Sequence, residues 1–197
     1  MKRILLPVFL CLCCIAAKAQ FSFGVKAGVN QNSVRGDKDP SGNISYKSST
    51  GFHVGVYGSI PLAKKLSVNP ELQYIRKQSQ DYGGNLNYLE LPILFNYQIS
   101  NHFAFELGPS IGKEIYAKRY LPWWKSISFK SYEEALDFGL IGGVKFIASD
   151  KLSIAARYNY SFLPFVNYNF NNGPGTQIEH YELYNSNVQL SVMYKIK

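Results

Sequence analysis

The stretch that most constrains the fold is residues 86–117, where apolar side chains recur at every second position. The alternating positions are Leu89, Leu91, Ile93, Phe95, Tyr97 and Ile99, then Phe103, Phe105, Leu107, Pro109 and Ile111. Successive side chains of a β-strand point to opposite faces, so this pattern predicts two long strands joined by a tight turn at residues 100–102. The other face is sparse and carries carboxylates such as Glu90 and Glu106. An apolar face opposite a face with acids favours a barrel that has lipid outside.

The first 19 residues have the features of a secretory signal peptide. Lys2 and Arg3 precede an apolar run, and Ala17-Lys18-Ala19 fits the small-x-small cleavage pattern. All three cysteines lie in this segment, and none follows the small residue that a lipid-modification site requires: Cys11, Cys13 and Cys14. We therefore expect a signal peptide over residues 1–19 and a single exported domain over residues 20–197, held together without disulfides.

Alternating patterns predict eight strands in the mature chain. They cover residues 21–34, 50–60, 66–78, the two strands of 86–117, 135–148, 152–165 and 184–196. The connections alternate between longer segments (35–49, 79–85, 118–134, 166–183) and tight ones (61–65, 100–102, 149–151). This predicts an all-β fold: an eight-stranded antiparallel up-and-down transmembrane β-barrel in the outer membrane, with short periplasmic turns and longer extracellular loops. A soluble lipocalin-like ligand-binding barrel has the same periodicity, but its polar face is outside, in water, and its apolar face is inside. Periodicity alone does not separate the two folds.

The charges favour the transmembrane alternative. The face opposite the apolar one carries four bases and five acids: Lys26, Glu71, Glu90, Glu106, Glu114, Asp137, Lys145, Arg157 and Lys195. Eight strands enclose an interior just wide enough for side chains, so we expect a barrel-interior charge network of ion pairs and no open pore. Arg76 and Lys113 are exceptions on the apolar face and are expected at the outer rim, where long basic side chains reach the membrane interface.

Three prolines interrupt the predicted strands: Pro70, Pro92 and Pro109. Proline cannot donate to the hydrogen-bond ladder, and a closed barrel has no free edge to accommodate it. We therefore expect bulges or local gaps in the pairing at these positions.

The sequence resembles a known family along nearly the whole mature chain, least of all in the loops. The segments that carry the resemblance are NYLELPILFNY with FAFELGPSIG, the start FSFGVKAGVN, GFHVGVYGSIPL, LSVNPELQY and the terminal VQLSVMYKIK. They resemble the PorT-type outer-membrane β-barrel family of Bacteroidota-like Gram-negative envelopes. The resemblance implies an eight-stranded barrel of the outer membrane and supplies no catalytic motif. Barrel proteins of this kind commonly end on an aromatic residue, whereas this chain ends Tyr194-Lys195-Ile196-Lys197.

Neither an enzyme nor a cofactor is indicated by the residues. The three histidines are His53 on the inner face, His102 in a tight turn and His180 in a longer connection, and no serine lies in a recognisable nucleophile setting. No acid or histidine spacing matches a metal-binding pattern. We therefore expect no catalytic activity, no cofactor and no metal.

The most distinctive loop is KRYLPWWKSISFK, residues 118–130. It places four bases around two tryptophans and contains no acid: Lys118, Arg119, Trp123, Trp124, Lys125 and Lys130. Tryptophan prefers the membrane interface and bases attract phosphates, so this loop is a candidate surface-binding site, or simply a solvated loop with aromatics on the membrane. Without residues 1–19 the chain has 21 − 3 = 18 bases against 13 acids, a modest net charge of +5.

Together these features predict a structural or surface-interaction protein of the cell envelope. The expected partners are outer-membrane lipid, anionic glycolipid headgroups and an envelope or secretion-system protein, and nucleic acid is not expected. The alternative functions are a small porin-like channel for solutes and the soluble lipocalin-like barrel.

Overall fold

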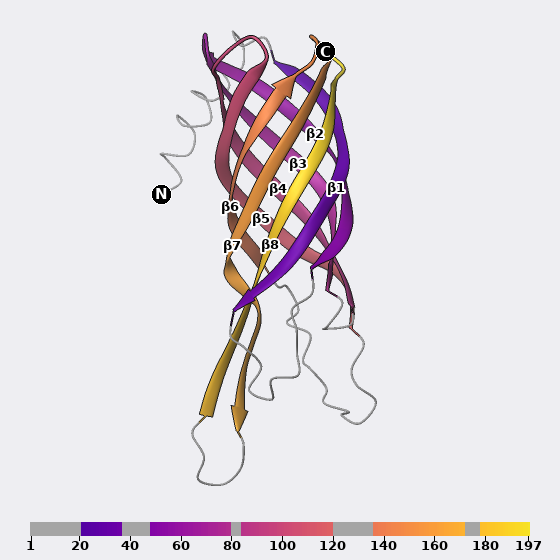
Figure 1. Ribbon diagram of the computed structural model, residues 1–197, viewed down its shortest axis with the longest axis vertical. Coiled ribbons are helices and arrows are strands. Elements are labelled where there is room, and N and C mark those ends of the chain that lie inside the picture. The colour runs from indigo at the N-terminus through magenta and orange to yellow at the C-terminus, as the bar shows by residue number, and fades with distance from the viewer. Residues whose placement is uncertain (1–20, 37–47, 80–83, 120–135, 172–177) are drawn as a thin grey trace, which may run out of the picture.

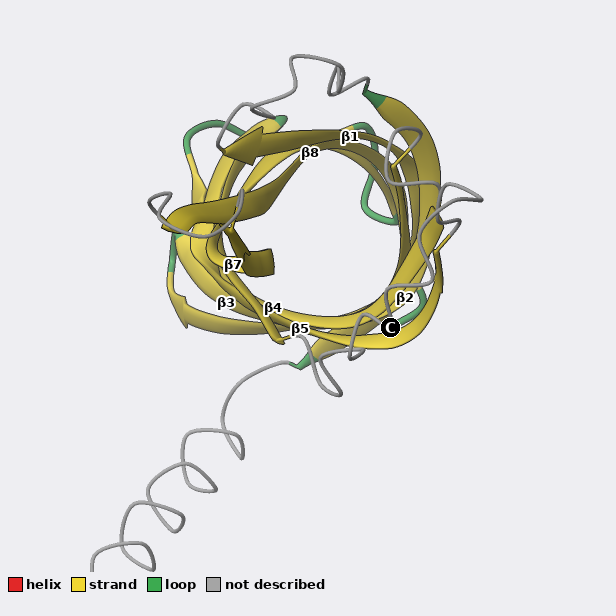
Figure 2. Ribbon diagram, turned by 90° about the horizontal axis from the view of Figure 1, so that it is seen from below, coloured by secondary structure: helices red, strands yellow, loops and turns green. Residues whose placement is uncertain are grey.

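The chain folds into one closed β-barrel. The computed structural model describes residues 21–36, 48–79, 84–119, 136–171 and 178–197. Its eight strands are β1 (Ser22–Gly36), β2 (Ser49–Ala63), β3 (Leu66–Ser79), β4 (Gly84–Gln98), β5 (Phe103–Arg119), β6 (Leu136–Ile147), β7 (Leu152–Asn171) and β8 (Ile178–Lys195). Each strand pairs antiparallel with the next, and β8 closes the ring on β1 (Figures 1 and 2). The predicted up-and-down topology is confirmed. Within the described ranges no helix is long and apolar enough to cross a membrane.

The two ends of the barrel differ. Three tight turns, between β2 and β3, β4 and β5, and β6 and β7, lie at the end where the chain terminates (Figure 1). The longer connections all leave from the opposite end, which we call the loop end. β1 finishes there at Gly36, whose φ of 138° is a conformation that side-chain-bearing residues rarely adopt. A Cβ atom at Gly36 would lie 2.0 Å from the Glu182 carbonyl oxygen, so glycine also permits the close approach of β1 to β8.

The hairpin of β7 and β8 extends beyond the rest of the barrel. β6 pairs with β7 only as far as Ser161, and β1 pairs with β8 only as far as Leu183, whereas β7 and β8 remain paired out to Asn171 and Ile178. Figure 1 shows this ribbon projecting from the loop end. The sequence prediction ended the seventh strand at residue 165 and began the last at 184. It was wrong here because register shifts around Pro164 break the period-two alternation.

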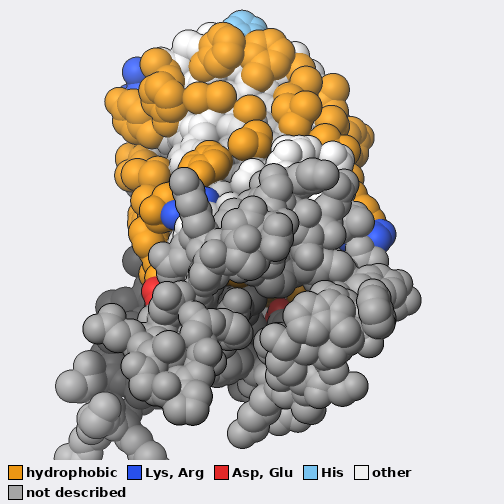
Figure 3. Space-filling model, turned by 60° about the horizontal axis from the view of Figure 1, so that its bottom comes forward, with side chains coloured by type: hydrophobic (Ala, Val, Ile, Leu, Met, Phe, Trp, Pro, Cys, Tyr) orange, Lys and Arg blue, Asp and Glu red, His pale blue; other side chains and the backbone are white. Residues whose placement is uncertain are grey.

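The outward face is predominantly apolar, with Arg76 and Lys113 as charged exceptions nearer the loop end. Alternate side chains of every strand are both large and exposed, among them Val54, Leu72, Ile93, Leu107, Leu140 and Leu190 (Figure 3). These are the residues assigned to the apolar face from the sequence, and that assignment is confirmed. An exterior of this kind requires lipid around it, so the soluble lipocalin-like alternative is excluded.

The predicted prolines are accommodated without any register shift. On either side of Pro70 the β3–β4 pairing keeps one register, with Pro70 opposite Ile93 and Gln73 opposite Glu90. The residues between these two pairs are unpaired in the β3–β4 ladder. The β4–β5 ladder has a similar gap after Pro92 and also keeps its register across it. The expected local gaps are present there, while the register shifts occur elsewhere, at Pro61–Ala63, Asn87–Tyr88 and around Pro164.

Candidate functional site: the charged barrel interior

The inward face carries the chemistry of this barrel. Among the described residues, eight buried side chains are charged, four basic and four acidic: Lys26, Lys77, Lys145, Arg157, Glu71, Glu90, Glu106 and Asp137. Their formal charges sum to zero. A buried charge is tolerated when it is paired and hydrogen-bonded, and each of the eight lies within ion-pair distance of a partner of opposite sign.

Arg157 is the centre of the larger cluster. Its Nη1 and Nη2 donate to the two carboxylate oxygens of Glu71 at 2.8 and 2.9 Å, and its Nε donates to Glu106 at 2.6 Å. The guanidinium is thus used as a two-sided fork, the geometry in which arginine binds carboxylates most strongly. Two lysines complete the cluster: Lys26 lies 2.7 Å from Glu71, and Lys145 lies 3.1 Å from Glu106.

These contacts cross the barrel. Arg157 is on β7 and Glu71 is on β3, four strands away in a ring of eight, so the pair lies on opposite walls. Figure 2 shows the ring that this pair must span. The ion pair therefore bridges the full width of the interior.

Glycine provides the space for this crossing. Gly143 on β6 is opposite Glu106 on one side and Arg157 on the other. A Cβ atom at Gly143 would lie 2.8 Å from Cγ of Arg157, closer than real side chains approach. The missing side chain lets Arg157 reach Glu106 across the intervening strand.

A second cluster lies nearer the loop end. Lys77 Nζ lies 2.7 Å from Asp137 and 3.6 Å from Glu90, and 4.8 Å from the centre of the Tyr88 ring. Asn159 donates to this same oxygen of Glu90, Oε1, at 2.8 Å, and Gln73 donates to the other one, Oε2. Lys77 therefore pairs with two carboxylates, drawn from β4 and β6.

Apolar side chains pack inside the barrel next to this second cluster. Ile75, Leu86, Tyr88 and Leu183 are buried together, with Val34 packed against them. They come from the halves of β3, β4 and β8 that are nearer the loop end. Polar side chains share this level: Lys77 is opposite Leu86, and Asn32, Ser49 and Asn185 are also buried towards the loop end.

A histidine and a serine meet in the interior beside Gly28. Gly28 is opposite His53 on β2 and Ser191 on β8, and His53 Nε2 lies 2.7 Å from Ser191 Oγ. Catalytic serines need a base that is itself oriented by a third group. Here Nδ1 of His53 has no hydrogen-bond partner among the described residues, and both side chains are buried. Nor do the described residues contain a group of three or more metal-ligating side chains.

Most of the predicted network is where the sequence placed it. Seven of the nine residues are buried inside: Lys26, Glu71, Glu90, Glu106, Asp137, Lys145 and Arg157. Glu114 is half-buried, with the Tyr88 hydroxyl 3.5 Å away. Lys195 was wrongly predicted to lie inside: it has the inward phase, but it is the last residue of β8 and is exposed at the tight-turn end.

One residue of the network was missed. Lys77 shares the inward phase of Glu71 and Gln73 on the third predicted strand, so the alternation alone could have identified it. The loop prediction falls largely outside the described residues: Trp123, Trp124, Lys125 and Lys130 lie there entirely. Lys118 and Arg119 end β5, and the placement of their side chains is likewise outside the description.

Comparison with known proteins agrees with this architecture. The sequence model for the outer membrane protein beta-barrel domain matches residues 16–167. The barrel is similar to Neisserial surface protein A (12% identity, TM-score 0.54, covering 87% of this chain and 96% of that one). It is also similar to Ail, the attachment invasion locus protein of Yersinia pestis (13% identity, TM-score 0.51, 89% and 98%). Curated proteins gave no match.

Proposed function

This chain belongs to the outer membrane protein beta-barrel domain family, and on that premise we propose that its barrel is closed to solutes and non-enzymatic. Its role would be structural or surface-interacting, with function carried by its outer surface and loops. An eight-stranded wall encloses little more than side chains.

One observation carries the proposal: the Arg157–Glu71 ion pair joins opposite walls of the barrel. A hydrated solute would have to displace a guanidinium that makes three short hydrogen bonds. Buried charge-assisted bonds of this kind are about twice as strong as neutral ones, so the crossing is expected to persist.

Planar-bilayer recording of the refolded protein tests this proposal. The parent barrel should give no stable conductance steps. The neutral double variant Arg157→Ala/Glu71→Ala removes the crossing and serves as the matched control, in which steps should appear or increase. Reproducible ohmic steps from the parent would contradict a closed barrel.

The small-channel alternative has one observation in its favour. Several buried polar atoms on the inner wall have no hydrogen-bond partner among the described residues, including Asn30 Oδ1, Asn187 Nδ2 and Gln189 Oε1. Such atoms favour water in parts of the interior. The same recording decides between the two functions.

For the surface role, we propose that the basic loop of residues 118–130 binds an anionic glycolipid headgroup. Ail, of similar fold, has been solved in complex with the heparin analogue sucrose octasulfate (16% identity, TM-score 0.50). The PorT-type resemblance adds an envelope or secretion-system protein as a candidate partner.

Replacing Lys118, Arg119, Lys125 and Lys130 by Gln tests the loop proposal. Each base near an anionic surface contributes about 1 kcal/mol, so this variant should bind anionic glycolipid far more weakly and with little salt dependence. A variant that binds as well as the parent would leave the loop as a solvated segment with aromatic membrane anchors.

A further inference from the structure

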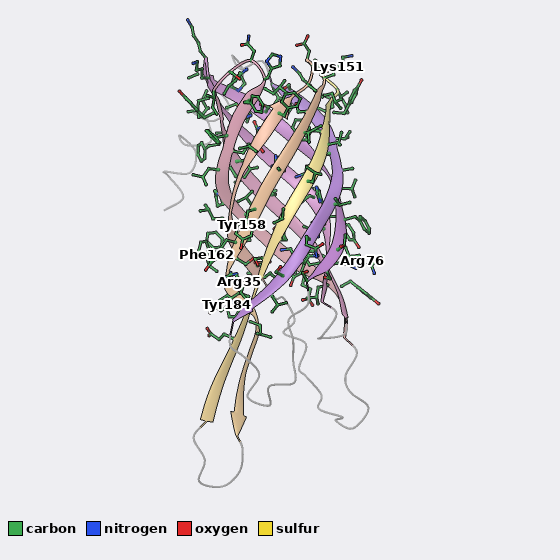
Figure 4. The ribbon with its side chains drawn as sticks, in the orientation of Figure 1. Arg35, Arg76, Lys151, Tyr158, Phe162 and Tyr184 are labelled. Carbon is green, nitrogen blue, oxygen red and sulfur yellow. The ribbon has the colours of Figure 1, made fainter. Side chains whose placement is uncertain are left out.

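The tight-turn end of the barrel is strongly basic. Five exposed lysines lie there: Lys64 and Lys65 in the turn between β2 and β3, Lys151 before β7, and Lys195 and Lys197 at the end of the chain. Asp150 is the one acid among the described residues of these turns and of the chain end. We call these five residues the lysine crown. Figure 4 labels Lys151 at this end and Arg76 at the opposite one.

Backbone hydrogen bonds hold the crown against the barrel wall. Lys195 N donates to the Lys151 carbonyl oxygen at 2.8 Å, Phe23 N donates to that of Lys197 at 3.0 Å, and Gln98 N donates to that of Lys65 at 2.8 Å. The backbone of Lys65, Lys151, Lys195 and Lys197 is therefore fixed at the rim of the barrel.

An aromatic girdle lies directly beside the crown on the outward face. Its exposed members are Phe21, Phe23, Tyr97, Phe103, Phe146 and Tyr194, and several of these rings pack on one another. Aromatic girdles lie at the level where acyl chains meet headgroups. The crown lies beyond this girdle, towards the tight-turn end of the barrel, and is therefore at the level of the headgroup phosphates.

A recess accompanies the charge. It has a volume of about 130 Å³, and its lining includes Lys64 and Lys65 together with the polar side chains of Ser67, Asn96 and Gln98. Ser67 and Asn96 have the inward phase of β3 and β4, so the recess opens into the mouth of the barrel, and Lys64 and Lys65 stand at its edge.

We propose that the lysine crown binds anionic phospholipid headgroups of the leaflet that faces the tight turns. Short turns of outer-membrane barrels face the periplasm, so this is the periplasmic leaflet. The crown adjoins the aromatic girdle and so meets lipid headgroups before any soluble partner. The site is separate from the loop of residues 118–130 and does not depend on whether the barrel conducts.

Lipid retention by the full-length folded protein in detergent, measured by native mass spectrometry, provides the test. Phosphatidylglycerol and phosphatidylcholine are the two probes. The parent should retain phosphatidylglycerol preferentially. Lys64→Gln/Lys65→Gln should reduce that preference by about 20–30-fold, because each lysine beside an anionic headgroup changes affinity about fivefold. Replacing all five crown lysines should reduce the preference further, to well below that of the double variant.

The matched control is Arg76→Gln/Lys113→Gln, which removes the same charge from the outward wall nearer the loop end. It should keep the preference for phosphatidylglycerol. An equal loss in this control would show that net charge, and not the crown, is responsible. Raising sodium chloride from about 50 to about 500 mM shortens the screening length and should weaken the preference in the parent itself, a measurement that needs no variant.

Two further results would overturn the proposal. One is an unchanged phosphatidylglycerol preference in the folded five-lysine variant. The other is loss of binding to isolated peptidoglycan, with lipid preference intact, in Lys64→Gln/Lys65→Gln. That result would assign the crown to cell-wall carboxylates instead.

Discussion

Replacing Arg157 by Leu should destabilise the barrel, because two buried carboxylates lose a positively charged partner. The side chain is buried and holds three hydrogen bonds to Glu71 and Glu106, at 2.6 to 2.9 Å. Removing one partner of a buried ion pair costs roughly 3–5 kcal/mol, because the remaining charge stays buried without compensation. Here Glu71 keeps Lys26 at 2.7 Å and Glu106 keeps Lys145 at 3.1 Å. We therefore expect the lower end of the range, about 3 kcal/mol.

Heat-modifiable migration in detergent gels measures this effect. At about 2–4 °C per kcal/mol for a chain of this size, the midpoint should fall by about 6–12 °C. Arg157→Lys keeps the charge but not the fork, so its midpoint should lie between those of the parent and the leucine variant. Leu107→Ala is the matched control on the lipid side. It should shift the midpoint by less, because detergent fills the space and leaves no cavity.

The double variant Arg157→Leu/Glu106→Gln tests the reasoning itself. It removes the carboxylate that Lys145 keeps in Arg157→Leu, so it should be less stable than Arg157→Leu alone, but by less than the sum of the two single effects, because both changes remove the same Arg157–Glu106 contact. If Arg157→Leu and Leu107→Ala were tolerated equally, or if the two changes simply added, pairing across the interior would not be what stabilises this barrel.

Two further predictions concern the same interior. Lys77→Met should lower the unfolding midpoint at least as much as Arg157→Leu, because Asp137 and Glu90 both lose Lys77, their ion-pair partner. If Lys77→Met were as stable as the parent, the second cluster would not contribute to stability. Gly143→Val should destabilise by roughly 1–3 kcal/mol through overpacking against the Ala156 carbonyl oxygen and Arg157, whereas Gly142→Val, on the outward face beside Leu107, should cost little. The same gels compare the two variants, and equal shifts would contradict the role of Gly143 as a spacer.

The alternation of apolar and polar residues alone determines a great deal of this fold. Leu91, Ile93 and Phe95 face outward and Glu90 faces inward because a strand offers only two directions, and the lengths of the connections then fix an even, closed ring. The assignment of faces by alternation failed at two kinds of position: where a local feature shifts the alternation, and where the strand ends. Pro164 shifts the register of β7, and Lys195 has the inward phase at a height where the barrel no longer encloses it.

Which inward residues pair with one another could not be predicted from the sequence. Glu71 and Arg157 are 86 residues apart, and alternation says only that both point inward. Their meeting depends on how far the strands tilt and stagger when the ring closes, which sets the height of each residue along the axis. A weaker signal does exist: Gly28 and Gly143 each stand between two inward polar residues that bond across them. The signal is not general, because Gly139 stands in the same way between Ser110 and Ser161, and Ser161 Oγ has no hydrogen-bond partner among the described residues.

Charge is also ordered along the barrel axis. The cluster of Lys26, Lys145, Arg157, Glu71 and Glu106 carries a formal +1 and lies towards the tight turns, whereas Lys77, Glu90 and Asp137 carry −1 nearer the loop end. Lys145 connects the interior to the rim, since its side chain is 10% exposed while it pairs with Glu106. The positive potential of the lysine crown therefore continues inward, and like charges in both regions add at the tight-turn mouth. Neutralising the crown should consequently weaken anion attraction there without removing it, because the interior cluster retains its +1.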